Sequence, residues 1–119
     1  MDREAASRIR KAILDLRQER EQIEETLLES REILRGSLVA HTILSGGYRR
    51  RQPAFYLYRV DARRRRMVYL KKDLLPRARE QVEAYRNFQK GLRRLRQIGK
   101  EILVKFKALR ESADALESR

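Results

Sequence analysis

The sequence predicts a mainly α-helical fold: two long antiparallel coiled-coil helices with a small antiparallel β-sheet of two or three strands inserted between them. Three observations predict this fold. Residues 3–35 contain neither Gly nor Pro and carry an apolar stripe at helical spacing. Residues 76–116 carry a second apolar stripe. The segment between the two stripes is rich in aromatic and branched residues, which favour strands.

The first predicted helix has a narrow apolar seam. Its members recur at alternating steps of four and three and are Ile9, Ile13, Leu16, Ile23, Leu27 and Leu34. Arg20 and Ser30 occupy the two positions that interrupt the pattern, which is typical of a coiled coil. Gly36 predicts that the helix ends at residue 35, because glycine readily adopts the left-handed conformation that is common after helix ends.

The second predicted helix begins near Pro76, where a missing backbone N–H costs little, with Asp73 as the predicted N-cap. Its seam includes Gln81 as a polar member; the others are Ala78, Tyr85, Phe88, Leu92, Leu95, Gly99, Ile102, Phe106, Leu109, Ala113 and Leu116. We expect Gly99 to permit close approach of the two helices at some cost in helix propensity.

Two seams that flank one insert predict a single helical hairpin, although the sequence also allows pairing between two chains. Within one chain, we expect Leu27 to lie near Tyr85 and Phe88. We expect Ile9 to lie near Ile102 or Phe106.

The insert between the helices shows strand and turn signals. Residues 54–60 and 66–70 predict a β-hairpin, with a polar turn that starts at Asp61. Residues 38–44 fit either a third strand or a short helix. Residues 45–53 predict a loop that contains Tyr48 and three arginines. We therefore expect one domain over residues 1–119, made of a first helix (1–35), a basic β-rich insert (36–75) and a second helix (76–119).

The net charge of +13 is unevenly distributed along the chain. Residues 1–35 hold 8 basic and 9 acidic side chains, whereas residues 36–75 hold 10 basic and 2 acidic ones. Residues 76–119 hold 12 basic and 6 acidic side chains. The insert and the second helix therefore produce the positive field, which favours polyanionic partners.

Two arginine runs in the insert are the candidate binding residues. Seven guanidinium groups on neighbouring loops repel one another without a counter-anion, and the planar donor fork of arginine suits phosphate. The predicted nucleic-acid-binding surface is one continuous edge, supported by the second helix and by one tyrosine on which a base can stack. Its members are Arg49, Arg50, Arg51, Arg63, Arg64, Arg65, Arg66, Arg93, Arg94, Arg96 and Tyr48.

Plainer interpretations apply to the same residues. Charged loop tips are often only solvated, or they protect the edge of a sheet. The other tyrosines of the insert are expected to pack across strands rather than to stack on bases. The preference for arginine over lysine fits a GC-rich coding sequence, but that does not explain the excess of basic over acidic residues.

The residues that most catalytic sites need are scarce. The chain has no cysteine and one histidine, His41, so neither a thiolate site nor a histidine pair is available. Asp61 and Asp73 fit turn and cap positions, and Gly46-Gly47 is too short for a phosphate-cradling loop. We expect a protein without enzymatic activity and without a cofactor or metal. No apolar segment has the length of a membrane span or a signal peptide, which predicts a cytoplasmic location.

Four stretches carry a resemblance to a known family: 34–39 (LRGSLV), 53–57 (PAFYL), 68–74 (VYLKKDL) and 82–88 (VEAYRNF). Over roughly residues 34–95 the chain resembles an uncharacterised prokaryotic family of short proteins with no assigned function. The resemblance implies a helix, a small sheet and a second helix. Many members carry a cysteine cluster in the loop before the aromatic strand. Here that loop, residues 45–52, has none, so no metal site is implied and the arginine triplet stands in its place.

The sequence thus predicts a non-enzymatic nucleic-acid-binding accessory protein, or a small subunit of a nucleoprotein complex, with DNA or RNA as partner. The alternative is a coiled-coil adaptor or assembly protein whose basic face docks an acidic protein. A homodimer is compatible with either. Binding to a membrane surface is disfavoured, because the first helix is too acidic.

Overall fold

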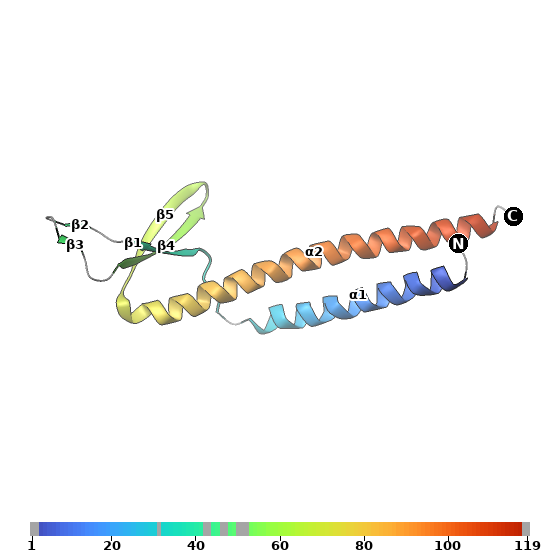
Figure 1. Cartoon of the computed structure of the whole chain (residues 1–119), viewed down its shortest axis with the longest axis horizontal. Helices are drawn as coiled ribbons and strands as arrows, with labels where there is room; N and C mark the ends of the chain where they lie inside the picture. The colour runs from blue at the N-terminus through green and yellow to red at the C-terminus, as the bar shows by residue number, and fades with distance from the viewer. Residues whose placement is uncertain (1–2, 31, 42–43, 46–47, 50–52, 118–119) are drawn as a thin grey trace. The chain divides into compact units, whose positions relative to one another are not determined.

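The computed structural model describes residues 3–30, 32–41, 44–45, 48–49 and 53–117, with side chains over 3–30, 32–41 and 53–112. Its two long helices are α1 (Arg3–Glu29) and α2 (Leu75–Glu117), and the strands lie between them in the sequence (Figure 1). The strands are β1 (Ser37–His41), β2 (Leu44–Ser45), β3 (Tyr48–Arg49), β4 (Ala54–Asp61) and β5 (Arg64–Leu70), and a short 3-10 helix, η1 (Lys72–Leu74), precedes α2. The predicted fold class is therefore confirmed.

The chain divides into two compact units, which are described separately. The helical hairpin contains Met1–Glu29 and Gln89–Arg119, and the sheet unit contains Ser30–Phe88. Helix α2 contributes its first turns to the sheet unit and the rest of its length to the helical hairpin.

Helix α1 ends at Glu29, so the prediction that it continues to residue 35 is wrong. The backbone N–H of Leu34 donates to the carbonyl of Gln81 at 3.0 Å. The side chains of Arg77 and Gln81 donate to the carboxylate of Glu32 at 3.0 and 2.9 Å. These bonds hold residues 32–34 along the first turns of α2. Leu34 therefore does not belong to the helical seam, although its spacing fits.

Helix α2 begins at Leu75, one residue before its predicted start, and is described as far as Glu117. Asp73, however, lies inside η1, two residues before α2 begins, so its prediction as the N-cap of α2 is wrong. The 3-10 turn provides the change of direction between β5 and α2, and the N–H of Leu74 donates to the carbonyl of Lys71 at 3.0 Å.

The core of the helical hairpin follows the predicted seam of α1. Ile13 packs with Ile98 and Ile102 of α2, and the residues packed around them are Ile9, Leu16, Ile23 and Leu109. The two helices run antiparallel, with the start of α1 and the end of α2 at the same end of the helical hairpin (Figure 1). Ile9 thus belongs to the cluster that contains Ile102, as predicted. Leu27 contacts Gly91, about one turn beyond its expected partner Phe88.

On α2 the seam is rotated from its predicted position. Leu95, Ile102 and Leu109 face the core region as expected, and all three are buried or half-buried. Leu92 and Phe106 are instead 43% and 52% exposed, and a β-carbon on Gly99 would meet nothing within 4 Å. The prediction that Gly99 lies on the seam is therefore wrong. Ile98 is fully buried, which removes more apolar area from water than burial of a glycine would.

The sheet unit contains a three-stranded antiparallel sheet in the order β1-β4-β5, with β2 paired to β3 in the connection between β1 and β4. The undecided segment after Gly36 is a strand. Gly36 has φ +139°, and an added β-carbon would lie 2.7 Å from the carbonyl oxygen of Tyr58. Only glycine fits where the chain enters β1.

Strand register assigns the side chains to two faces. Leu38, Leu57 and Val68 are cross-strand neighbours, so they share one face, and Val39, Tyr56 and Tyr69 share the other. Leu57 is 5% exposed on the first face. On the same face the guanidinium of Arg79 lies 5.2 Å from the Phe55 ring centroid. This inner face therefore meets the start of α2, where Leu75, Ala78 and Val82 are buried. We call the opposite face the outer face.

Candidate nucleic-acid interface

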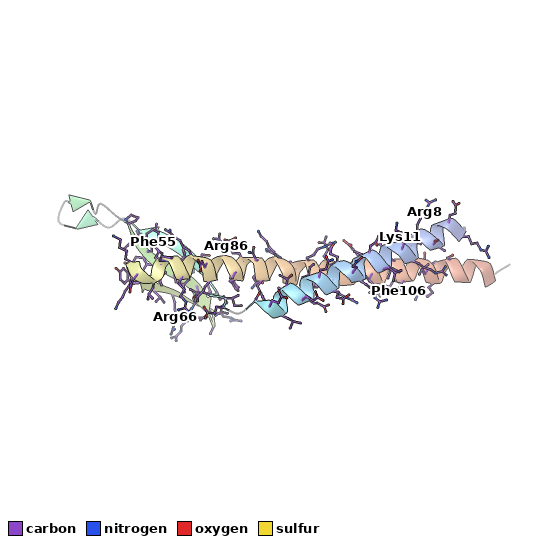
Figure 2. All side chains as sticks on the ribbon, turned by 90° about the horizontal axis from the view of Figure 1, so that it is seen from below. Arg8, Lys11, Phe55, Arg66, Arg86 and Phe106 are labelled. Carbon is purple, nitrogen blue, oxygen red and sulfur yellow. The ribbon has the colours of Figure 1, made fainter. Side chains whose placement is uncertain are left out.

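The second arginine run lies on an exposed hairpin end. We call Arg63–Arg66 the turn arginines. Arg63 belongs to the two-residue turn between β4 and β5, and the other three begin β5, an edge strand of the sheet. All four side chains are exposed. Because strand side chains alternate, Arg64 and Arg66 extend from the inner-face side and Arg65 from the outer face. Figure 2 labels Arg66 among the side chains of the sheet unit.

The nearby carboxylates are already paired with other arginines. Asp61 forms ion pairs with Arg35 and Arg59, and its Oδ2 lies 2.8 Å from Nε of Arg59. Glu32 pairs with Arg77. Hydrogen bonds from Arg77 and Gln81 hold the pKa of Glu32 below its usual range. Within the described part of the chain, the turn arginines have no carboxylate partner.

Two like charges also face each other across the ladder. Arg59 of β4 is directly opposite Arg66 of β5. The Nε of Arg59 is buried and makes no hydrogen bond in the described structure, because its ion pair with Asp61 is close but poorly directed. Like charges directly opposite one another destabilise a sheet. This end of the sheet is therefore suited to an external anion.

The first arginine run falls largely outside the described residues. Arg50 and Arg51 lie outside the described residues, and Tyr48 and Arg49 are described only as backbone of β3. Strand β3 belongs to the connection that leaves the sheet between His41 and Ala54. The Ala62–Arg63 turn lies at the opposite end of β4, which at about 3.4 Å per residue spans roughly 24 Å. The connection that carries the first run and the turn arginines therefore leave the sheet from opposite ends of β4, and one continuous edge on both loops stays a prediction.

Arg94, a predicted phosphate contact, instead holds the two helices together. Its Nε and Nη2 donate to the Glu19 carboxylate at 2.6 and 2.8 Å, and Nη1 lies 3.4 Å from Glu101. The hydrogen bonds to Glu19 raise the pKa of Arg94 and lower that of Glu19. Arg94 is thus engaged within the helical hairpin, and its contact with phosphate stays a prediction. The sequence contained both charges, but only the packing of α1 on α2 decides which of them meet.

Arg93 and Arg96 are exposed, as the prediction requires. Arg93 belongs to a row of exposed cations on α2 away from its seam: Lys90, Arg93, Lys100 and Lys107. We call this row the basic helix stripe. The only acidic residue between residues 90 and 107 is Glu101, which is paired with Arg94. Arg96 lies at the border of this row. Helical spacing of the cations is the sequence signal that identifies the row.

The outer face of the sheet is aromatic. The rings of Tyr56 and Tyr69 meet edge to face, with centroids 5.7 Å apart, so the predicted cross-strand packing is confirmed for this pair. His41 extends the row, with its ring centroid 6.4 Å from that of Tyr56. Tyr69 nevertheless keeps 56% of its surface exposed, and Met67 keeps 48%. An accessible ring therefore lies on the same face as Arg65.

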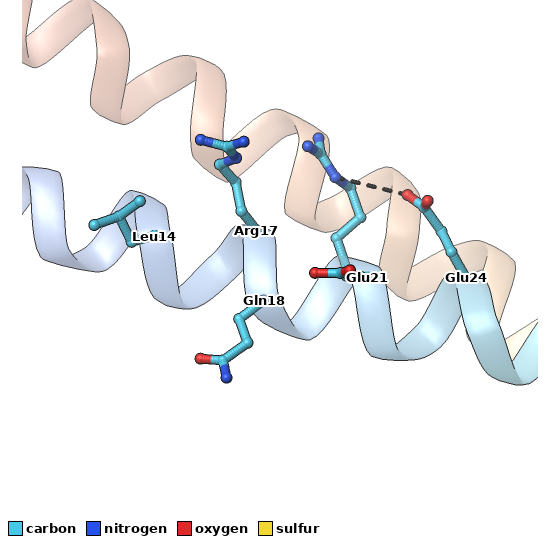
Figure 3. Close-up of a pocket in the computed structure, with 6 residues that line it drawn as sticks. Leu14, Arg17, Gln18, Glu21 and Glu24 are labelled. Carbon is cyan, nitrogen blue, oxygen red and sulfur yellow. Dashed lines mark ion pairs between the residues drawn. The ribbon is translucent and has the colours of Figure 1, made fainter.

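Other kinds of site are weakly supported. A surface hollow in the helical hairpin is lined by Leu14, Arg17, Gln18, Arg20, Glu21 and Glu24, and its Arg20–Glu24 ion pair spans 3.7 Å (Figure 3). All these residues belong to α1, so the hollow is open rather than walled from two sides. Among the described residues, no three His, Asp or Glu side chains gather in a way that could hold a metal ion.

Within the same residues, neither long helix is apolar enough over a sufficient length to cross a membrane. Comparison of the chain with protein-family models, with curated proteins and with solved structures found no match. The resemblance to a prokaryotic family, the cytoplasmic location and the lack of enzymatic activity therefore stay predictions.

Proposed function

We propose that this protein is a non-enzymatic nucleic-acid-binding protein that contacts phosphates through the turn arginines. One observation carries the proposal: four exposed arginines follow one another on a turn and an edge strand, while the nearby carboxylates are engaged by other arginines. A phosphate backbone supplies the missing counter-charge, and its oxygens match the bidentate donors of arginine. Each neutralised phosphate also releases condensed counterions, which favours binding.

The backbone of the turn supports a functional role for its sequence. Ala62 and Arg63 have φ values of +48° and +66°, in the left-handed region that favours glycine or asparagine. An arginine at such a position costs stability, and residues retained at that cost concentrate at functional sites. The basic helix stripe on α2 offers further cations for phosphates, and Tyr69 offers a ring for an unpaired base.

The experiment replaces Arg63, Arg64, Arg65 and Arg66 with Gln and measures binding to a generic duplex and to a single strand as a function of salt. We expect affinity to fall and the slope of log K against log salt to flatten, by about 0.9 for each duplex phosphate that the variant no longer neutralises. The matched control replaces Arg3, Arg8, Arg10 and Lys11 of α1 with Gln, since those side chains are exposed too and the same four charges are removed.

Equal reductions in affinity for both variants would show that only total charge matters, and the turn arginines would have no special role. If the unmodified protein binds neither duplex nor single strand at about 50 mM salt, the proposal fails. The coiled-coil adaptor, with an acidic protein on the arginines, then becomes the better account.

A further inference from the structure

The part of α2 within the helical hairpin has a second apolar stripe beside its seam. The stripe consists of Leu92, Gly99, Leu103 and Phe106, at helical spacings of seven, four and three. Leu92, Leu103 and Phe106 are 43%, 55% and 52% exposed. At about 100° per residue, this stripe lies roughly a quarter turn from the seam that contains Ile98. Figure 2 labels Phe106 on this helix.

Helix α1 has a matching second stripe. Leu14 and Leu28 are 59% and 87% exposed and lie fourteen residues apart, with Glu21 midway between them. The open hollow of Figure 3, which Leu14 and Glu21 help to line, lies on this side of α1. The stripe is about a third of a turn from the α1 seam, in the same rotational sense as on α2. Because the helices are antiparallel, rotation in the same sense brings both stripes to the same side of the helical hairpin.

A helix with two apolar stripes about a quarter to a third of a turn apart is typical of a four-helix bundle, in which each helix contacts two neighbours. The core of the helical hairpin is thin by itself: its fully described buried cluster is Ile13, Ile98 and Ile102. The exposed side, with Leu14, Leu28, Leu92, Leu103 and Phe106, has the composition of a second core layer. A partner that covers it would bury apolar area on both helices at once.

The opposite net charges of α1 and α2 favour a second copy of this chain as the partner. Residues 12–29 of α1 hold six acidic and two basic side chains, whereas residues 89–110 of α2 hold eight basic and one acidic. The surface beside the two stripes therefore changes sign from one helix to the other. A second copy turned so that its α1 lies on α2 of the first presents opposite charge along both new contacts. Pairing like helices would place like charges together.

We propose that the protein forms a homodimer in which two helical hairpins pack by these stripes into a four-helix bundle, with α1 of each copy on α2 of the other. The twofold axis runs parallel to the helices. The proposal concerns the helical hairpin alone and is independent of nucleic-acid binding.

Such a twofold axis predicts which residues meet. Rotation about an axis parallel to the helices leaves the position of each residue along that axis unchanged. Helix α1 therefore meets α2 of the second copy at the same level at which it meets α2 of its own chain. Within the chain, Glu19 lies level with Arg94, and Ile13 with Ile98 and Ile102. Leu14 therefore lies level with Gly99 and Leu103 of the second copy, where the open glycine leaves room for a leucine side chain. Because the helices are antiparallel, Glu21 lies level with Leu92 of the second copy, about one turn from Arg96, whose long side chain can span that distance.

The first test is the molecular mass in solution, by sedimentation equilibrium or light scattering. We expect a dimer for the unmodified chain at about 100 µM, because dimerisation depends on concentration. Phe106→Glu and Leu14→Glu place a charge in the proposed interface and should each give a monomer. The matched control is Val104→Glu: Val104 is 65% exposed on α2 but lies away from the stripe, so this variant should stay dimeric. A monomeric unmodified chain would overturn the proposal.

Charge reversal and cross-linking test the pairing without relying on a stable monomer. Glu21→Arg and Arg96→Glu should each raise the dimer dissociation constant roughly tenfold or more, and the two changes together should restore it. The chain has no cysteine, so Leu14→Cys with Leu103→Cys introduces the only thiols. Oxidation should give a covalent dimer from this double variant and none from Leu14→Cys alone. Efficient cross-linking by Leu14→Cys alone would place α1 against α1 and overturn the pairing.

Discussion

Leu27 of α1 lies directly over Gly91 of α2: its Cδ2 is 2.9 Å from the point where a β-carbon on Gly91 would be. Cγ2 of Ile23 is 3.5 Å from the same point. Two branched side chains of α1 thus fill the space that the glycine leaves on α2. This contact provides the close helix approach that the sequence suggested for Gly99.

Replacement of Gly91 by Leu should destabilise the helical hairpin, because the new side chain has to displace Leu27 and Ile23. We expect a decrease of about 1–3 kcal/mol in the free energy of unfolding. Gly91→Ala should have a smaller effect, since the terminal methyl of Leu27 can rotate away and alanine favours the helix. Urea unfolding followed by circular dichroism measures both, and an unchanged midpoint for Gly91→Leu would contradict this contact.

Gly99→Ala should act in the opposite direction. Within one chain an added β-carbon meets nothing within 4 Å, so at concentrations where the chain is monomeric the gain in helix propensity is unopposed. We expect stabilisation of up to about 1 kcal/mol in the same unfolding experiment. Destabilisation would mean that Gly99, not Gly91, lies at the intrachain seam.

The Glu19–Arg94 ion pair predicts a pH dependence. Hydrogen bonding to Arg94 lowers the pKa of Glu19 below 4.5, so the folded state favours the charged carboxylate more than the unfolded state does. The stabilisation is therefore present above pH 4.5 and is lost as the pH falls through the lower folded-state pKa. Glu19→Gln should lower the urea midpoint at pH 7 but change it little at pH 2. Glu25→Gln, at an exposed site on the same helix, serves as the control. An equal effect of Glu19→Gln at both pH values would exclude this linkage.

Arg63→Gly should stabilise the sheet unit. Arg63 has φ +66° in a two-residue turn, where glycine is strongly preferred. Relief of the left-handed strain should be worth about 1 kcal/mol. Arg65→Gly is the control: it removes the same charge from the extended strand β5, where glycine weakens pairing. The thermal unfolding temperature should rise for Arg63→Gly and fall for Arg65→Gly. A shift in the same direction for both variants would contradict the turn assignment.

Arg66→Thr should raise stability at low salt while it weakens nucleic-acid binding. The change removes the like-charge contact with Arg59 across the ladder and introduces a residue that favours strands. We expect a gain of about 0.2–1 kcal/mol, smaller at high salt, where the repulsion is screened. A decrease in stability that is independent of salt would show that Arg66 contributes by packing rather than by charge.

The candidate site was only partly predictable, because a sequence shows where charges lie along the chain but not which of them neutralise one another. Arg63–Arg66 were identifiable as a run at a hairpin turn, and the structure places them on the β4–β5 turn and the start of β5. Arg94 has the same sequence signal as Arg93. The packing of α1 brings Glu19 to Arg94 and leaves Arg93 exposed. The antiparallel pairing of β1 and β4 places the connection that carries the first arginine run at the opposite end of β4 from Arg63–Arg66.

The sequence by itself determined the two long helices, the β-hairpin between them and the apolar stripe of α1, because hydrophobic period and turn residues are local signals. The tertiary structure decided where α1 ends, since hydrogen bonds to Arg77 and Gln81 compete with continued helix at residues 32–34. It also decided which of two neighbouring stripes on α2 faces α1. The predicted seam and the observed seam share the seven-residue repeat and the positions Leu95, Ile102 and Leu109, so periodicity alone cannot distinguish them. Burial of Ile98 against Ile13, with Leu27 over Gly91, makes that choice.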